Sequence, residues 1–259
     1  MFQNGQVDVF PKKGKTSGAF CSSSSTQPTF VLLNHIEDFR SLTTLAHEMG
    51  HALHSKYSKV QRPVYEDYTI SVAEVASTFF ENLVFEDAMQ GLDDKQKMVL
   101  LHDKINDDIS TIFRQIACFN FENELHESVR KEGFVPKEKI AELMNKHMQS
   151  YLGNKFEMKE GDGYFFVTWS HIRNFFYVYS YAFGQLVSDA LYEMYKQDKS
   201  NIVKIKKFLS AGGSDSPENI FKAIGINPDK KFFEKGLKKI ERNIATLEKL
   251  WILSKRSFK

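Results

Sequence analysis

Cysteine is scarce in this chain of 259 residues, which contains only Cys21 and Cys118. Neither their number nor their spacing is typical of a disulfide framework or a cysteine metal site, and such usage favours a reducing compartment. Residues 1–20 show no secretory signal pattern, and no apolar run approaches the length that crosses a bilayer. We therefore expect a cytoplasmic protein without a membrane partner.

Glycine and proline are also modest, with 14 and 6 residues, whereas phenylalanine is abundant at 23. With 42% hydrophobic residues the chain can bury a substantial core, which excludes a disordered protein. This balance favours a packed, mainly α protein, and we expect residues 1–259 to form a single domain.

The chain also has no large excess of charge of one sign, since its net charge is only +2. The charges are unevenly spread, however: residues 199–259 hold 15 Lys or Arg against 6 Asp or Glu. Such a basic segment raises nucleic-acid binding as a rival hypothesis. Its cations repeat at helical spacing, as at Lys235, Lys238, Lys239 and Arg242, which is typical of a solvated helix face. We therefore expect no nucleic-acid partner.

The clearly strand-like stretch lies near the N-terminus. Short runs with apolar residues at 7–10, 17–21 and 29–33 are separated by turn-forming and polar segments. We expect a hairpin or small sheet, a β element within residues 1–34.

The stretch from Leu42 to His54 reads LTTLAHEMGHALH and carries the functional hypothesis. Its apolar residues recur at three and four positions, which predicts an amphipathic helix from about residue 37 to about residue 57. His47 and His51 are four apart and therefore lie one turn apart on one face of this helix. That face carries no lysine before Lys56, unlike an ordinary solvated face.

Two histidines at this spacing suit a zinc ion, which binds imidazole nitrogens at about 2.0–2.1 Å. Glu48 follows the first histidine and is placed to take a proton from an attacking water. The same five-residue pattern arises by chance in on the order of one in a hundred chains of this length. A third ligand is therefore needed to distinguish a zinc site from a chance occurrence of the pattern.

The third ligand comes from a second helix, which follows a connection of about ten residues. In two antiparallel helices, His51 and Glu74 lie at similar depths, each roughly 8–9 Å from the connection. We therefore predict one zinc ion held by His47, His51 and Glu74, with Glu48 as general base.

Four other side chains fit the third position less well. Glu66 and Asp67 lie too near the connection, and Glu81 lies nearly two turns too deep. His54 follows His51 by three residues and would lie a turn beyond the metal.

Further helices are predicted over residues 95–131, over residues 137–151, and in two segments after the glycines at 212 and 213. Ser170 is expected to cap another helix, which runs through about residue 196. The sequence therefore predicts a mainly α fold with a small β element at its start.

Several stretches occur together, in one order, along nearly the whole chain. They are Val7–Val9 with Gly14–Lys15 and Ser17–Phe20, Leu45–Ser55, Glu74–Glu81, His171 with Phe176–Ala182, and Ala211–Ser214. In this combination the chain resembles the oligoendopeptidase F branch of the thimet oligopeptidase-like zinc metallopeptidases. The resemblance implies a zincin-like, mainly helical catalytic domain that binds one Zn²⁺ and cleaves short unstructured oligopeptides.

The resemblance also implies that His171, Tyr177 and Tyr181 contact the substrate carbonyl region, where their donors would stabilise an oxyanion. Tyr177 and Tyr181 are four apart, so both can face the cleft from one helix. The alternative is that residues 175–183 form a buried aromatic helix face. Because six residues on a helix are about 240° out of phase, His171 and Tyr177 reach one substrate only if His171 lies at or before the helix start.

Gly18, Ala19 and Phe20 would belong to an edge strand against which an extended peptide lies. The family's members are considerably longer, and their additional N-terminal helical region forms the opposite wall of the cleft. Three explanations stay open: a truncated product, an isolated catalytic domain, or half of a split enzyme whose N-terminal half is a separate partner. We favour a zinc-dependent endopeptidase, and the alternative is a non-catalytic remnant that binds zinc or peptides.

Overall fold

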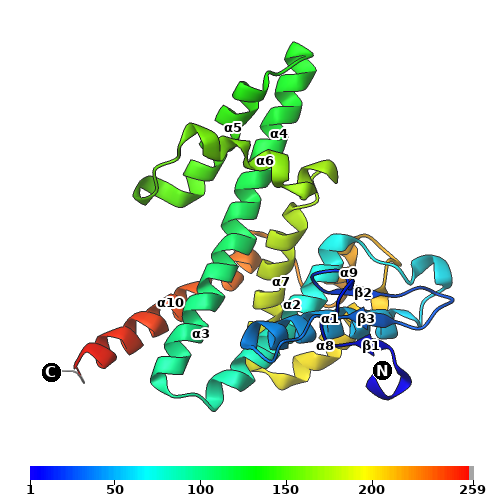
Figure 1. Cartoon of the computed structure of the whole chain (residues 1–259). Coiled ribbons are helices and arrows are strands. Elements are labelled where there is room, and N and C mark those ends of the chain that lie inside the picture. The colour runs from blue at the N-terminus through cyan, green and yellow to red at the C-terminus, as the bar shows by residue number, and fades with distance from the viewer. Residues whose placement is uncertain (257–259) are drawn as a thin grey trace. The chain divides into compact units, whose positions relative to one another are not determined.

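The structure is a computed structural model of the chain, and it describes residues 1–256. By its internal contacts the chain divides into two compact units (Figure 1). The first unit comprises Met1–Ile105 together with Gly184–Lys259, and the second comprises Asn106–Phe183. The expectation of a single catalytic domain over residues 1–259 stays a prediction.

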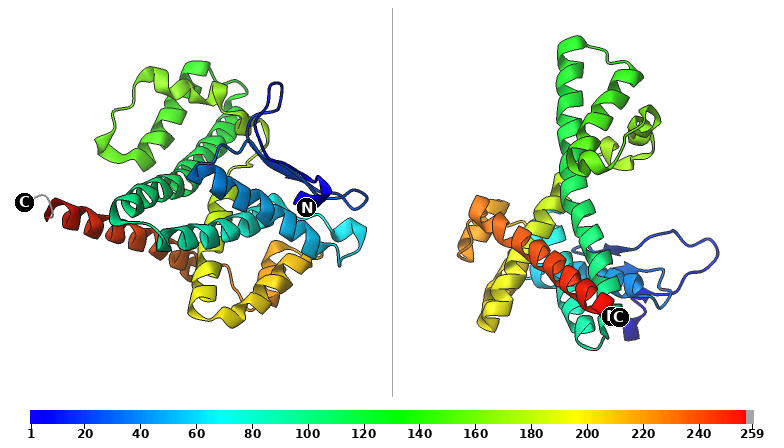
Figure 2. Two further views of the ribbon diagram at one scale, coloured as in Figure 1. Left: turned by 60° about the horizontal axis from the view of Figure 1, so that its bottom comes forward. Right: turned by 90° about the vertical axis from the view of Figure 1, so that its left-hand side faces the viewer.

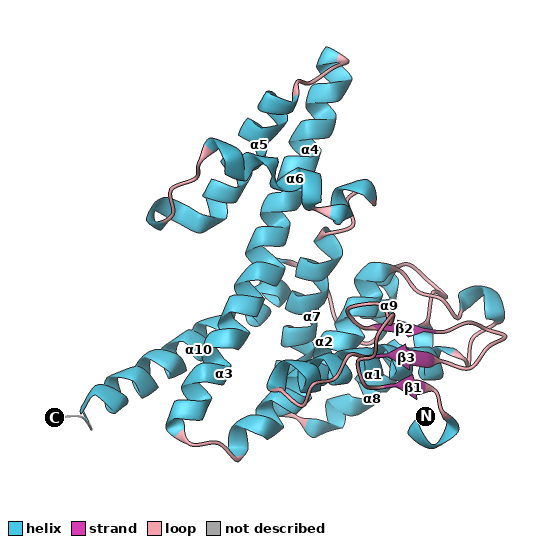
Figure 3. Ribbon diagram, in the orientation of Figure 1, coloured by secondary structure: helices cyan, strands magenta, loops and turns pink. Residues whose placement is uncertain are grey.

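Helices make up most of both units, and the strands found in residues 1–256 all belong to one small sheet (Figure 3). This confirms the predicted mainly α fold with a small β element. The sheet has the strand order β1 (Val7–Asp8), β3 (Phe30–Leu32), β2 (Phe20–Ser22). β3 is parallel to β1 and antiparallel to β2, so β2 is an edge strand. Within the described part of the chain, no helix combines the length and apolar character that crossing a bilayer requires.

The sheet packs on α1 (Phe39–Ser58) through a small apolar cluster. Val31, Leu33 and Ala52 are its buried members, none of them more than 3% exposed. Both views of Figure 2 show the dark-blue N-terminal segment beside the blue α1. This packing places β2 along the helix that carries the two histidines.

α1 and α2 (Ile70–Gln90) pack against each other and form the centre of the first unit. α1 begins after Asp38, whose side chain accepts a hydrogen bond from the backbone N–H of Ser41 at 2.7 Å. Val75 and Phe79 of α2 are at most 2% exposed, because α2 lies in the interior of the unit. Both helices of the predicted pair are confirmed, with boundaries shifted by one or two residues at α1.

The remaining helices of the first unit are the start of α3 (Asp94–Ile109), the end of α7 (Tyr179–Gln197), α8 (Ile202–Ala211), α9 (Pro217–Ala223) and α10 (Lys230–Arg256). The turn after α8 touches the α1–α2 connection. There, the N–H of Gly213 donates to the carbonyl of Tyr65 at 2.9 Å, and a Cβ on Gly212 would lie 2.3 Å from that oxygen. Only glycine leaves room for this contact.

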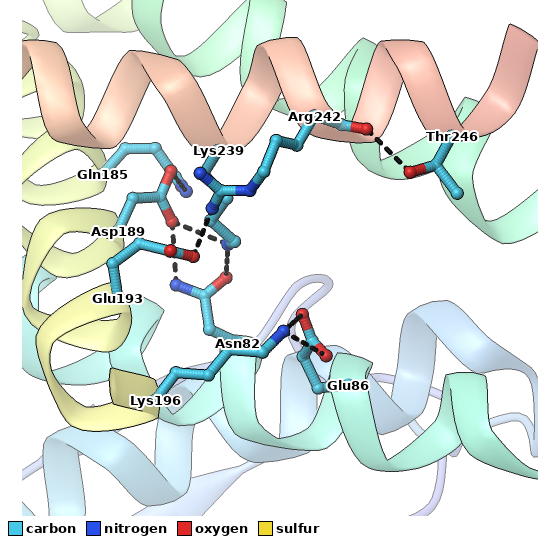
Figure 4. Close-up of polar contacts among 9 residues, drawn as sticks. All are labelled: Asn82, Glu86, Gln185, Asp189, Glu193, Lys196, Lys239, Arg242 and Thr246. Atoms are coloured by element: carbon cyan, nitrogen blue, oxygen red, sulfur yellow. Dashed lines mark hydrogen bonds and ion pairs between the residues drawn. The ribbon is translucent and has the colours of Figure 1, made fainter. Parts of the chain in front are cut away.

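A buried polar cluster joins α2, α7 and α10 (Figure 4). Lys239 and Asp189 form an ion pair with Nζ 2.8 Å from Oδ1, and their side chains are 3% and 0% exposed. Asn82 donates to the same carboxylate oxygen at 2.9 Å and accepts a hydrogen bond from Lys239, while Gln185 donates to the other oxygen. Burial alone would raise the pKa of Asp189, but the charges of Lys239 and Lys104 hold it below its usual value. The carboxylate therefore stays ionised and ties three helices together.

We expect Lys239→Met to lower the free energy of unfolding by about 3–5 kcal/mol, because it leaves the buried Asp189 carboxylate without its cation. The double variant Lys239→Met with Asp189→Leu removes both charges and should recover most of that loss. Urea denaturation of the variants measures the difference. Lys238→Met, at the exposed neighbouring position, is the matched control. A single variant as stable as this control would show that the ion pair does not hold the helices.

The second unit is built on α4 (Gln115–Glu132) and α5 (Lys137–Leu152), which lie side by side in both views of Figure 2. A π-helical turn at Ser110–Arg114 separates α3 from α4, so the predicted helix over residues 95–131 is not uniform. α6 (Phe165–Thr168) and several short turns follow α5. One buried hydrophobic cluster of the unit consists of Ala117, Cys118, Phe121, Leu143, Met144, Met148, Trp169 and Val178.

The predicted helix starting after Ser170 is wrong over its first part. Ser170–Arg173 form a 3-10 turn, and α7 starts only at Tyr179. Between these elements, Phe175 and Phe176 have φ angles of +38° and +54°, in the left-handed region that a right-handed helix excludes. The hydrophobic periodicity of the sequence continues through this segment. It therefore cannot show that tertiary contacts keep the backbone here from becoming helical.

Candidate functional site

His47 and His51 face α2 from α1. Their Nε2 atoms are 3.1 Å apart, and their rings meet edge to face with centroids 4.8 Å apart. Glu74 of α2 joins them, with its Oε2 at 3.6 Å from Nε2 of His47. One ligand atom from each of the three residues lies within 4.8 Å of the others. The structure thus brings together the three side chains that the helix spacing predicts, as one group of potential metal ligands.

Two glycines let the helices approach closely at this group. A Cβ on Gly50 of α1 would lie 2.7 Å from the Cα of Ser77 of α2. A Cβ on Gly184 of α7 would lie 2.5 Å from the Cβ of Glu74. Ser77 in turn lies next to Glu74 and places its hydroxyl 3.4 Å from Oε2. Any larger residue at Gly50 or Gly184 would therefore displace α1 or Glu74.

Glu81, which the depth argument placed too far away, contacts the group through His47. Its Oε1 hydrogen bonds with Nδ1 of His47, which leaves Nε2 facing His51 and Glu74. Metal-binding histidines commonly have their second nitrogen held by a carboxylate in this way. His47 lies 11 residues before the end of α1 at Ser58, and Glu81 lies 11 residues after the start of α2 at Ile70, so the two lie at similar depth in this antiparallel pair. That relation in the sequence could have identified Glu81.

The other candidates that the spacing excluded do not join the group. His54 is fully buried and stacks on the ring of Tyr68, with centroids 3.6 Å apart. Glu66 and Asp67 lie in the connection between α1 and α2. The predicted exclusion of these three side chains agrees with their positions.

The charges of the group are strongly coupled. Burial alone would lower the pKa of His47, but the hydrogen bond and charge of Glu81 and the charges of Glu74 and Glu48 raise it to about 9. Burial, and then the charge of His47, lowers the pKa of His51 to about 3. Burial is also the main reason why the pKa values of Glu74 and Glu48 are raised. Three buried or half-buried carboxylates around two histidines form a cluster that a cation would stabilise.

Glu48 links this cluster to the sheet. It is 6% exposed, and its carboxylate accepts a hydrogen bond from the backbone N–H of Cys21, which offsets part of the pKa rise caused by burial. Cys21 lies in β2. The residue predicted as general base is therefore held by the backbone of the edge strand.

Gly18, Ala19 and Phe20 only partly match the predicted edge strand. β2 starts at Phe20, because Gly18 has a φ of +82° and turns the chain just before the strand. The carbonyl of Gly18 accepts a hydrogen bond from Nδ2 of Asn34 at 2.8 Å, and Ala19 packs in the cluster between sheet and α1. In the described residues, β2 pairs with β3 alone, so its other edge pairs with no strand.

His171, Tyr177 and Tyr181 form a cluster in the second unit. The ring centroids are 5.4 Å apart for His171 and Tyr177, 5.7 Å for His171 and Tyr181, and 5.5 Å for the two tyrosines. Nε2 of His171 and the hydroxyl of Tyr181 are 3.2 Å apart and hydrogen bonded. His171 lies before the helix start, as the geometry requires.

Tyr177 also precedes α7, so the expectation that both tyrosines project from one helix is wrong. The alternative of a buried aromatic helix face over residues 175–183 fails as well, because Phe175 is 79% exposed and lies outside the helix.

Comparison with known proteins places these observations in a family. The sequence profile described as peptidase family M3 matches residues 1–239. The chain belongs to peptidase family M3. This confirms the predicted family resemblance.

Two relatives illustrate how much of an M3 protein is present. Oligopeptidase PepF of Bacillus subtilis is 31% identical over an alignment of 262 residues, which covers 98% of this chain and 39% of that protein. An oligoendopeptidase F homolog of Borreliella burgdorferi is 34% identical over 229 residues, 87% of this chain and 39% of that protein. The M3 chain therefore spans 39% of the length of both relatives.

Solved structures agree with this assignment. The crystal structure of oligoendopeptidase-F from Enterococcus faecium matches with a TM-score of 0.69 and 27% identity, over 82% of this chain and 39% of that chain. A solved chain from Chlamydophila abortus matches with a TM-score of 0.81 and 27% identity, over 95% of this chain and 42% of that chain. The fold of the M3 chain is thus shared with part of a larger protein.

We expect Gly184→Ala in the M3 chain to push Glu74 away from the histidines and to weaken Zn²⁺ binding by about 10- to 100-fold, the usual cost of disturbing groups that orient metal ligands. Competition with a chromophoric chelator measures the affinity. Gly91→Ala is the matched control, because a Cβ on Gly91 meets no atom within 4 Å. Equal affinities of these two variants would contradict the role of the close approach at Gly184.

Proposed function

We propose that this chain is the catalytic part of a zinc-dependent endopeptidase that hydrolyses short, unstructured oligopeptides. The observation that carries the proposal is the group of His47, His51 and Glu74, with Glu48 beside it, in a chain of family M3. The names oligopeptidase and oligoendopeptidase F of the relatives support the class of substrate.

The chemistry of the group fits a zinc ion. Two imidazole nitrogens and one carboxylate oxygen are the protein ligands of many catalytic zinc sites, which keep a further position for water or substrate. The two Nε2 atoms face each other at 3.1 Å, and both His47 and His51 could direct a lone pair at one shared cation. Glu81 would fix the ring of His47 through its other nitrogen.

Zinc, when bound there, would supply a Lewis acid that polarises the scissile carbonyl and makes a water more acidic. Glu48 would take a proton from the attacking water and pass it to the leaving nitrogen. Burial raises the pKa of Glu48 and so makes its carboxylate a stronger base than an exposed one. The N–H of Cys21 would hold that carboxylate in place.

His171 and Tyr177 are proposed to donate hydrogen bonds to the negative charge that develops on the substrate oxygen. Tyr181, which is hydrogen bonded to His171, would hold the imidazole ring in one orientation. These roles rest on the family resemblance and on the clustering of the three rings in the second unit.

The substrate backbone is proposed to add to the unpaired edge of β2, next to Gly18, Ala19 and Phe20. Main-chain hydrogen bonds of this kind do not depend on side chains, so they suit an enzyme that accepts many peptide sequences. An extended peptide on β2 would lie on the strand whose Cys21 N–H binds Glu48.

The main competing proposal is a remnant that binds zinc or peptide without turnover, since the chain spans 39% of its relatives. A zinc analysis coupled to hydrolysis of an internally quenched peptide separates the two. The assay is run on the chain alone and with the remaining part of an M3 protein supplied as a separate polypeptide. Zinc-dependent cleavage in either arm supports the peptidase, and zinc binding with no cleavage in both arms supports the remnant.

Purified protein should carry close to one zinc ion per chain, and Glu74→Ala should weaken zinc binding by more than about 100-fold because it removes a ligand. Metal analysis after dialysis against a chelator measures the occupancy. Glu66→Ala, which removes a carboxylate of the α1–α2 connection, should keep full zinc. Loss of zinc from the Glu66 variant together with retention in the Glu74 variant would show that the ligand set is wrong.

Glu48→Gln should keep zinc and lower the turnover number by about 10²–10⁴-fold, since it removes the proton acceptor but keeps the shape of the side chain. Steady-state hydrolysis of the quenched peptide, with zinc content measured on the same samples, provides the test. Near-parental turnover would withdraw Glu48 as general base.

A further inference from the structure

The backbone just before α7 is strained. Phe175 and Phe176 are two consecutive non-glycine residues with positive φ, and Glu37 is the other one among the described residues. Non-glycine side chains rarely adopt such angles, and they keep them only where the surrounding structure imposes them. Something in the second unit must therefore hold this segment.

Glu122 of α4 is the group that holds it. Its side chain is fully buried, and Oε1 accepts a hydrogen bond from the backbone N–H of Phe176 at 2.8 Å, across 54 residues of sequence. The ring of Phe176 also packs on α4, with centroid distances of 5.8 Å to Phe119 and 5.0 Å to His126. These three residues of α4 share one face, so the helix contacts both the backbone and the ring of Phe176.

The side chain of Glu122 is well suited to hold the backbone N–H of Phe176. A carboxylate is a stronger acceptor for a backbone N–H than a neutral group. Its second oxygen, Oε2, is buried and makes no hydrogen bond. Native proteins seldom bury an incompletely bonded carboxylate, and such exceptions concentrate at functional sites.

The strain has a direct consequence for Tyr177. If residues 174–178 adopted a helical conformation, α7 would begin several residues earlier in the chain. His171 and Tyr177 would then lie on one helix, with their side chains about 240° apart around its axis. In the structure, the left-handed turn at Phe175 and Phe176 instead leaves the rings of His171 and Tyr177 with centroids 5.4 Å apart.

We propose that Glu122 is a positioning residue: by anchoring the N–H of Phe176 it keeps α7 from extending backwards and holds Tyr177 against His171. The proposal rests on the proposed peptidase function, because it assigns Glu122 to the placing of the oxyanion donors. Glu122 itself does not touch substrate.

The test compares Glu122→Ala with Glu122→Gln, which keeps an acceptor oxygen. Glu124→Ala is the matched control: Glu124 lies on the same helix and binds Lys146 and His147 instead. The first readout is hydrogen exchange of the segment 171–181 by mass spectrometry, which needs no activity. The second is kcat and KM for the quenched peptide, with zinc content measured alongside.

We expect Glu122→Ala to speed exchange at residues 174–178 and to lower kcat at least tenfold, with KM and zinc content within about twofold of the parent. Glu122→Gln should fall between the alanine variant and the parent, and Glu124→Ala should match the parent in exchange of this segment and in kcat.

A rescue variant separates positioning from general stability. Phe175 is 79% exposed, so Phe175→Gly removes few contacts while allowing a positive φ without strain. Added to Glu122→Ala, it should restore part of the exchange protection and raise kcat about threefold or more. The free-energy cost of a left-handed backbone at a non-glycine residue, which glycine avoids, corresponds to a factor of at least that size. If Glu122→Ala does not fold, the same rescue is measured on Glu122→Gln.

Parent-like exchange and kcat in Glu122→Ala, or losses that Phe175→Gly does not reduce at all, would overturn the proposal. A parent chain that cleaves no peptide in either form of the assay would instead overturn the proposed function. In that case the exchange measurements still decide whether Glu122 anchors the segment.

Discussion

The first unit depends on the contact between α1 and α2 at Gly50. No side chain separates the two backbones at this point, so polar residues on both helices face each other at ligand distance. Three carboxylates and two imidazoles then share an interior in which charged neighbours shift the pKa values of His47, Glu48 and Glu74. A wider helix pair would leave these groups in separate, solvated positions. The electrostatic character of the cluster is therefore a result of backbone proximity.

The helix pair and the ligand set could be predicted from the sequence because both follow from regular geometry. His47 and His51 share a face by spacing, and Glu74 follows from equal depth in an antiparallel pair. Glu81 was missed although the same geometry contains it, since its depth matches that of His47 and not that of His51. The start of α7 could not be predicted, because residue 176 is held by a carboxylate that lies 54 positions earlier in the chain. Neither composition nor periodicity records such a contact.

In both units, local preferences are violated where function is proposed. Phe175 and Phe176 adopt angles that their side chains disfavour, and Glu122 buries an oxygen without a hydrogen bond. His51 is kept neutral by burial and by the charge of His47. Elsewhere the rules hold: α1 is capped by Asp38, and Val75 and Phe79 of α2 pack in the interior of the first unit. Natural sequences generally confine such violations to functional or strained sites.

The ion pair of Lys239 has a consequence for biosynthesis. Asn82 and Lys239 are 157 residues apart, so the helix that carries Glu74 completes its polar contacts only after α10 has emerged from the ribosome. Domains usually fold during translation in N-terminal order. Here a nascent chain that ends before residue 239 would leave the Asp189 carboxylate without the cation that forms its ion pair in the folded unit. Such intermediates are expected to engage chaperones, and synthesis of the last helix would release them into the folded first unit.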